Sequence, residues 1–189
     1  MVVYSRWQNL EKIAVLVDGA QILSFKNLGK LIDPKRLLHV LTEGRKAVIA
    51  RWYQKVMIPD PRASLEVKNH IISMITWIVD HVVADNFYDV KISRKDTDSY
   101  MVADIYEIVH EKLAETIVIV SGDGVFTKPA RFARRSGIKV EVASTKKWMH
   151  PPPLAKSLEQ ECDRFIELAD FEDKILVARA TEEGISEIK

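Results

Sequence analysis

The amino-acid sequence predicts an α/β fold, in which helices cover both faces of a mostly parallel sheet. Short apolar runs rich in β-branched residues alternate with longer segments whose apolar residues recur every three or four positions. Turn and helix-cap residues such as Asp33-Pro34 and Ser136-Gly137 separate the two kinds of segment. Strands that alternate with helices form parallel sheets, because each connection must cross a face of the sheet.

The composition is that of a soluble globular protein. The chain has 189 residues, of which 47% are hydrophobic and 29% charged, so it can bury a core of its own. Its single cysteine, Cys162, excludes an internal disulfide and a multi-cysteine zinc site. We find no secretory signal, and the apolar stretch at 71–84 is too short to span a membrane. We therefore expect a cytoplasmic protein, with one domain at 1–170 and a charged C-terminal helix or tail at 171–189.

Five apolar runs predict the strands. Continuous runs that end at turn residues are typical of strands buried on both faces of a sheet. These runs lie at 12–17, 47–53, 87–92, 116–120 and 138–143.

The segments between these runs have helical periodicity. Asp33 and Pro34 are a helix cap and a first helical residue, which begins a helix that a glycine ends near position 43. The other predicted helices lie at 64–84, 99–113, 126–135 and 154–169. The long helix at 64–84 is apolar over residues 71–83, which leaves room for a homodimer or another protein partner.

Two aspartates end predicted strands. Asp18 follows the first strand and Asp123 the fourth. Ligands of open parallel sheets bind outside the carboxyl ends of the strands. With the strand order 3-2-1-4-5, strands one and four are neighbours, so the two carboxylates would repel each other unless they share a cation or a proton.

Two further aspartates could border the same cleft. Asp98 begins the helix that precedes strand four, and Asp104 follows six residues later. Ligands that offer only oxygen favour a hard ion such as Mg²⁺ or Mn²⁺. Each acid alone also has a structural interpretation, as a turn residue, a helix cap or a solvated side chain. Their joint position at one sheet edge favours the metal.

Basic residues concentrate after Asp123. Residues 125–148 hold seven Lys and Arg against one acid, Glu141, whereas the whole chain has a net charge of +1. The helix that begins beside Asp123 could bind phosphate through its N-terminus and its basic side chains. The candidate contacts there are Lys128, Arg131, Arg134 and Arg135, and Arg94 and Lys95 precede Asp98. A solvated basic face is the alternative interpretation.

Four motifs occur in a familiar order and spacing. They read VDGAQI, KDTDSYMVAD, SGDGVF and ECDRFIEL. Over residues 12–169 the chain resembles the NYN domains, in the LabA-like branch of the PIN-like nuclease superfamily. Gln21 stands where asparagine is usual, Val125 replaces a second acid, and Cys162 takes an alanine position.

The resemblance implies a three-layer α/β/α sandwich, PIN-like and Rossmann-like, whose central sheet has five strands. It also implies a metal-dependent ribonuclease, with Asp18, Asp98 and Asp123 as catalytic metal ligands and Asp104 as a further ligand. RNA is the implied partner, with Gln21 close to its path. Val125 keeps open an alternative, a catalytically weakened module that binds nucleic acid or protein without cutting.

Overall fold

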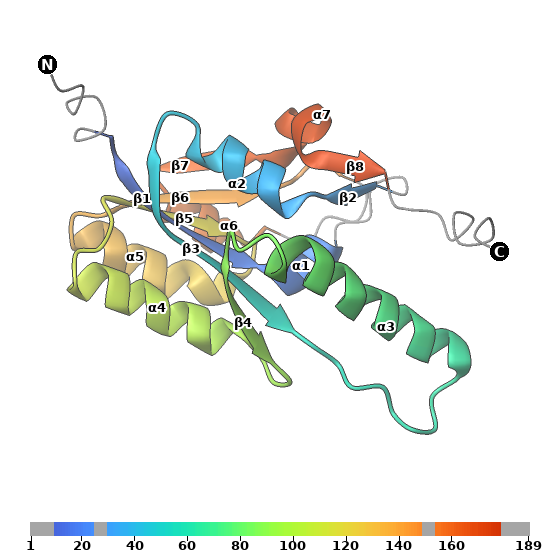
Figure 1. Cartoon of the computed structure of the whole chain (residues 1–189). Helices are drawn as coiled ribbons and strands as arrows, with labels where there is room; N and C mark the ends of the chain where they lie inside the picture. The colour runs from blue at the N-terminus through green and yellow to red at the C-terminus, as the bar shows by residue number, and fades with distance from the viewer. Residues whose placement is uncertain (1–9, 25–29, 149–153, 179–189) are drawn as a thin grey trace, which may run out of the picture.

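The chain folds around one six-stranded sheet, which a computed structural model describes for residues 10–24, 30–148 and 154–178. The strand order is β4-β3-β1-β5-β6-β7, and all five neighbouring pairs are parallel (Figure 1). These strands are β1 (Lys12–Asp18), β3 (Lys46–Lys55), β4 (Asp89–Ser93), β5 (Thr116–Val120), β6 (Lys139–Ser144) and β7 (Arg164–Glu167). The predicted order 3-2-1-4-5 is confirmed, with one strand added at the β6 edge.

Helices cover both faces of the sheet and make three layers (Figure 1). One face holds α1 (Gly19–Ser24), α2 (Pro34–Thr42), α3 (Leu65–Ile78) with a π-helical turn η1 (Val79–Val83), and α7 (Glu172–Ile175). The other holds α4 (Asp98–His110), α5 (Thr127–Arg135) and α6 (Lys156–Gln160). No helix within the described residues is long and apolar enough to cross a membrane.

The side chains of β1 show why helices must pack on both faces of the sheet. Ile13, Val15 and Val17 enter the core under α2 and α3, whereas Ala14 and Leu16 enter the core under α4 and α5. All five side chains are fully buried. Side chains alternate between the two faces of a strand, so a continuous apolar run requires apolar partners on both sides.

The sixth strand corrects the predicted helix at 154–169. Only α6 is α-helical there, and β7 then pairs with β6 in parallel. Asp163 explains the change, because its backbone N–H donates to the Val140 carbonyl at 2.7 Å and its carboxylate accepts from the Val140 N–H at 2.9 Å. These two hydrogen bonds hold Asp163 against β6, so the chain continues as an edge strand and not as a helix.

The segment assigned to a charged tail is partly built into the fold. After a 3₁₀ turn η3 (Leu168–Phe171) and α7, strand β8 (Leu176–Ala178) pairs antiparallel with β2 (Lys30–Ile32). Ile175 is fully buried, and its carbonyl accepts a hydrogen bond from the Asp33 N–H at 2.8 Å. Residues 171–178 therefore belong to the domain, and 179–189 lie outside the described residues.

The long helix is confirmed and leaves much of its apolar surface exposed. Ser64 caps α3 by accepting from the Val67 N–H at 3.3 Å. Ile71 and Ile78 are buried against the domain, whereas Ile72 and Val79 are 56% and 47% exposed. A homodimer or protein partner on this helix stays a prediction.

Candidate metal centre

The end of β1 brings Asp18 against the loop that follows β5. The two strands are neighbours, with Val17 opposite Val120, so the residues that follow them meet at one edge. Asp18 is only 8% exposed. Its Oδ2 accepts from the Ser121 hydroxyl at 3.1 Å and its Oδ1 from the Gln21 N–H at 3.2 Å. Asp18 is therefore a fixed carboxylate at the carboxyl edge of the sheet.

Ser121 also positions Asp123. Its Oγ accepts from the Asp123 N–H at 3.1 Å while donating to Asp18. The Asp123 carboxylate accepts from the Val125 N–H at 2.9 Å and caps the short 3₁₀ turn η2 (Gly124–Phe126). Asp123 is exposed, so it can still take a ligand from solvent. Ser121 lies inside the SGDG motif but was not among the predicted site residues.

Gln21 joins α1 to the same loop. Its side-chain Oε1 accepts a hydrogen bond from the Gly122 N–H, which holds α1 against the turn that carries Asp123. The structure therefore gives this side chain a role in positioning the loop, beside the predicted contact with nucleic acid.

Asp98 enters the cluster from the start of α4. Burial raises the pKa of Asp98 to about 7, and neighbouring carboxylates add to the rise. Those carboxylates belong, in decreasing order of effect, to Asp96, Asp18 and Asp123. Burial likewise raises the pKa of Asp18, which Asp123 raises further against the opposing hydrogen bonds. The acids are thus close enough to repel one another, and a cation would relieve the repulsion.

Asp96 is a member of this cluster that sequence reasoning missed. Its Oδ1 accepts from the Asp98 N–H at 3.2 Å, and its charge is the largest neighbouring influence on the Asp98 carboxyl. The signal was present in the spacing Asp-Thr-Asp of the KDTD motif. We call Asp18, Asp96, Asp98 and Asp123 the acid cluster.

The acid cluster suits a hard divalent cation that keeps part of its water shell. Mg²⁺ is usually held by one or two carboxylates plus waters and substrate phosphates. Within the described residues, no three metal-binding side chains converge on one point, so no closed protein cage forms. The oxygen-only donors and their mutual repulsion fit such an open site.

Glycine is required beside Asp18 for packing. A Cβ at Gly19 would lie 2.1 Å from the Trp52 indole nitrogen and 2.4 Å from the Gln54 amide oxygen. Both neighbours are buried and hydrogen-bonded to each other at 3.1 Å, so they have little freedom to move. Gly19 thus lets β1 turn into α1 directly against β3.

Comparisons with known proteins identify the family of the chain. The NYN domain family model matches residues 12–169, which is most of the chain. The chain belongs to the NYN domain family. NYN domains are part of the PIN-like nuclease superfamily, whose members typically depend on a divalent metal.

A solved structure of this NYN domain's fold comes from Vibrio parahaemolyticus. That protein, described as of unknown function, shares 21% identity and a TM-score of 0.61, over 90% of this chain and 98% of its own. At this identity the likeness concerns the fold alone. No curated protein gives a significant match.

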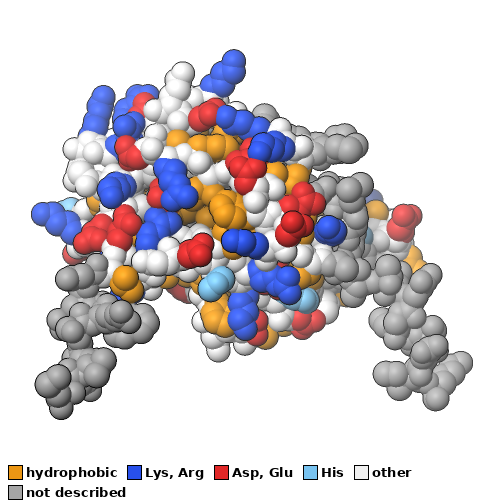
Figure 2. Space-filling model, turned by 90° about the horizontal axis from the view of Figure 1, so that it is seen from above, with side chains coloured by type: hydrophobic (Ala, Val, Ile, Leu, Met, Phe, Trp, Pro, Cys, Tyr) orange, Lys and Arg blue, Asp and Glu red, His pale blue; other side chains and the backbone are white. Residues whose placement is uncertain are grey.

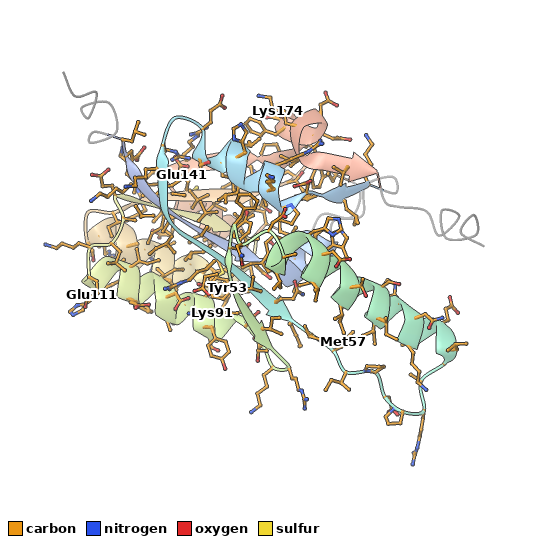
Figure 3. All side chains as sticks on the ribbon, in the orientation of Figure 1. Tyr53, Met57, Lys91, Glu111, Glu141 and Lys174 are labelled. Carbon is orange, nitrogen blue, oxygen red and sulfur yellow. The ribbon has the colours of Figure 1, made fainter. Side chains whose placement is uncertain are left out.

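Asp104 lies in a different set of contacts from the acid cluster of the NYN domain. It is buried on α4, where its carboxylate accepts from the Tyr53 hydroxyl and from Lys91 at 2.7 Å. Arg51 adds an ion pair at 3.1 Å. Figure 3 shows Tyr53 and Lys91 close together above α4. Protein cations already neutralise this carboxylate, so the structure does not bring Asp104 to the metal ligands.

The predicted basic contacts divide into two groups. Arg131 and Arg134 form ion pairs with Glu161 at 2.8 Å and with Asp163 at 3.0 Å, and with Arg135 they lie in the last half of α5. These three arginines and Glu161 line a hollow of about 290 Å³. Lys128, Arg94 and Lys95 are exposed, and Lys128 lies nearest to Asp123 along the chain.

A larger hollow lies elsewhere on the NYN domain. It measures about 910 Å³, and acids of the cluster are not among its lining residues. Lys35, Arg36 and Lys174 line it together with Asp33, Glu43 and Asp173, so its charge is balanced. Figure 2 shows this side of the molecule from above, with basic and acidic side chains interspersed. The chemistry of the acid cluster, rather than the size of a hollow, identifies the candidate site.

The raised pKa of Asp98 predicts how stability depends on pH and metal. The folded protein holds this proton more tightly than the unfolded chain, so the free energy of unfolding falls as pH rises from 3.8 to about 7. We expect Asp98→Asn to stabilise the metal-free protein at pH 8 by about 1 kcal/mol, allowing for solvent screening of this partly exposed group. That corresponds to a rise of about 2–4 °C in Tm.

Thermal denaturation in EDTA at pH 5 and pH 8 measures this effect, with the exposed Asp85→Asn as control. The gain should shrink at pH 5, because the parent is then protonated at Asp98. An equal gain at both pH values would contradict the proposed repulsion.

Proposed function

We propose that this NYN domain is a metal-dependent ribonuclease, which hydrolyses RNA phosphodiester bonds at the acid cluster with Mg²⁺ or Mn²⁺. One observation carries the proposal. Burial and, after it, three carboxylates from separate parts of the chain raise the pKa of Asp98 at the carboxyl edge of a parallel sheet. Such an uncompensated cluster destabilises the fold, and functional sites are where such groups gather. Its place in the LabA-like branch is part of the same proposal.

The protein's own groups would divide the work. A divalent cation held here would supply Lewis-acid activation of water and would offset charge on the phosphoryl group. Asp18 and Asp98 would hold the cation, and Ser121 fixes the orientation of Asp18. Asp123 is exposed and can orient the attacking water by accepting a hydrogen bond from it. Asp96 would keep the site negative, and so attractive to the cation.

Cleavage of labelled RNA tests the proposal. Single-stranded and structured RNAs incubated with Mn²⁺ should be cut by the parent protein, and EDTA should abolish the cutting. Asp123→Asn should reduce the rate, whereas Asp85→Asn, an exposed aspartate outside the cluster, should not. A parent protein that leaves every RNA intact while binding Mn²⁺ would contradict the proposal.

A second candidate function rests on Val125. This side chain is 45% exposed and stands next to the Asp123 cap, where a second acid is usual in the motif. The alternative is a module that binds nucleic acid or protein without cutting. It predicts weak Mn²⁺ binding by calorimetric titration, and activity that appears only when Val125→Asp restores the acid.

A further inference from the structure

Four basic residues on the α5 side of the site are paired with acids of the same domain, and Lys128 and Arg135 are not among these pairs. Arg131 pairs with Glu161, and Arg134 with Asp163. After β6, Lys146 likewise pairs with Glu159 and Lys147 with Asp170. A phosphate that binds there must compete with carboxylates, which weakens the contact.

Three cations on the opposite side have no such partners. Lys55 ends β3, and Arg94 and Lys95 follow β4; all three side chains are exposed. Across the described part of the chain, the side chains of these three residues form no ion pair and donate no hydrogen bond, although the Lys95 backbone N–H donates to the Ser93 hydroxyl. Lys55 is in register with Ser93, and the next backbone N–H, of Val56, donates to the Ser93 carbonyl at 2.9 Å. The three cations therefore lie together.

Strand alternation explains why Lys55 is free. Arg51, Tyr53 and Lys55 occupy successive positions on the α4 face of β3, and the first two both contact Asp104. Lys55 lies one repeat of about 7 Å further along the strand, beyond these contacts. The acids of α4 therefore neutralise Arg51, and Lys55 keeps its charge at the carboxyl edge.

Exposed apolar side chains continue this basic surface. Met57 and Ile58 follow Lys55 closely and are 56% and 59% exposed. Figure 3 shows Met57 on the connection between β3 and α3, clear of the sheet core. The exposed faces of unpaired bases can bury apolar surface against such side chains, whereas the bases of a duplex are stacked on each other.

We infer that single-stranded RNA reaches the acid cluster over Lys55, Arg94 and Lys95, with unpaired bases against Met57 and Ile58. Lys95 directly precedes Asp96, so phosphates on this surface lead straight to the acids. The inference rests on the proposed ribonuclease function for its substrate class. It places the main binding surface at the ends of β3 and β4 rather than at the paired arginines of α5, and it assigns Lys55 to that surface.

RNA binding without cleavage tests the inference. Fluorescence anisotropy with a labelled 12-nucleotide single-stranded RNA is followed in EDTA over a range of salt. The triple variant Lys55→Ala, Arg94→Ala, Lys95→Ala should bind about tenfold or more weakly, and its slope of log K against log salt should flatten by about two. The variant Met57→Ser, Ile58→Ser should lose affinity with the slope unchanged.

The matched control removes three paired cations, in Arg131→Ala, Arg134→Ala, Lys146→Ala. It changes the net charge by the same amount as the first triple variant. Because acids already neutralise these three cations, we expect less than a threefold loss of affinity. Equal losses in both triple variants, or no loss in the first, would overturn the inference, and so would tighter binding of duplex RNA than of single strands. Unchanged Tm values confirm that the exposed substitutions leave the fold intact.

Cleavage is measured separately on the same proteins, so the two ideas can fail independently. Asp98→Asn should still bind RNA in EDTA but not cut it in Mn²⁺. If the parent cuts no RNA and the first triple variant still loses binding, the nuclease proposal fails and the binding surface stands. If the parent cuts RNA and that variant binds as well as the parent, the binding surface fails and the nuclease proposal stands.

Discussion

Asp18→Asn should lower RNA cleavage by about 100-fold or more while leaving the fold intact. The asparagine keeps the shape of the side chain, so its Oδ1 can still accept from the Gln21 N–H. In the parent the Ser121 hydroxyl donates to Asp18, and in the variant the asparagine amide can instead donate to Ser121 Oγ. Only the charge is lost, and losing one group that stabilises transition-state charge typically costs two to three orders of magnitude.

The stability of the same variant separates this effect from damage to the fold. Burial already raises the pKa of Asp18, which means that the folded state tolerates a neutral group here better than a charge. Urea denaturation in EDTA should therefore show equal or greater stability, and calorimetric titration should show weakened Mn²⁺ binding. Asp18→Asn cleaving as fast as the parent would contradict the assignment of the site.

Asp104→Ala, unlike Asp18→Asn, should destabilise the fold, with a loss of about 3 kcal/mol in the free energy of unfolding. The substitution leaves Lys91 and the buried Tyr53 hydroxyl without their acceptor. Removing one partner of a buried ion pair typically costs about 3–5 kcal/mol, and Arg51 keeps Glu107 and Asp89, which favours the lower end. Urea denaturation measures the loss.

Two variants test the cause of that loss. Glu107→Ala removes an exposed member of the same network and should cost below about 1 kcal/mol. Adding Tyr53→Phe to Asp104→Ala should recover part of the loss, since it removes the orphaned hydroxyl. If Asp104→Ala instead stays stable and loses Mn²⁺ binding, Asp104 is a metal ligand after all.

The fold could be predicted from the sequence where burial on both faces left a continuous apolar signal. β5 was predicted with its observed ends, Thr116 and Val120, because every residue in it is buried. β7 was missed, because Leu154, Leu158 and Cys162 recur at helical spacing and the pairing with β6 is decided by Asp163, 23 residues away from Val140. Local periodicity does not contain contacts of that kind.

The candidate site, like the fold, could be predicted only in part from the sequence. Asp18 and Asp123 could be placed together, because each follows a strand and the strand order was inferred correctly. The basic segment after Asp123 could not be interpreted by counting, since the acids that neutralise Arg131 and Arg134 lie 29 or 30 residues further on. Lys55 went unnoticed because a lone lysine at a strand end is ordinary until the structure shows that it is unpaired.

The contact between Gly19 and Trp52 bears on how related sequences should be compared. This glycine is needed to pack α1 against β3, and the residues that require it, Trp52 and Gln54, are not members of the acid cluster. Across the family, selection on position 19 should therefore follow foldability, whereas positions 96, 98 and 123 should drift once activity is lost. We therefore expect Gly19 to report on the fold, and the acids of the cluster to report on the proposed activity.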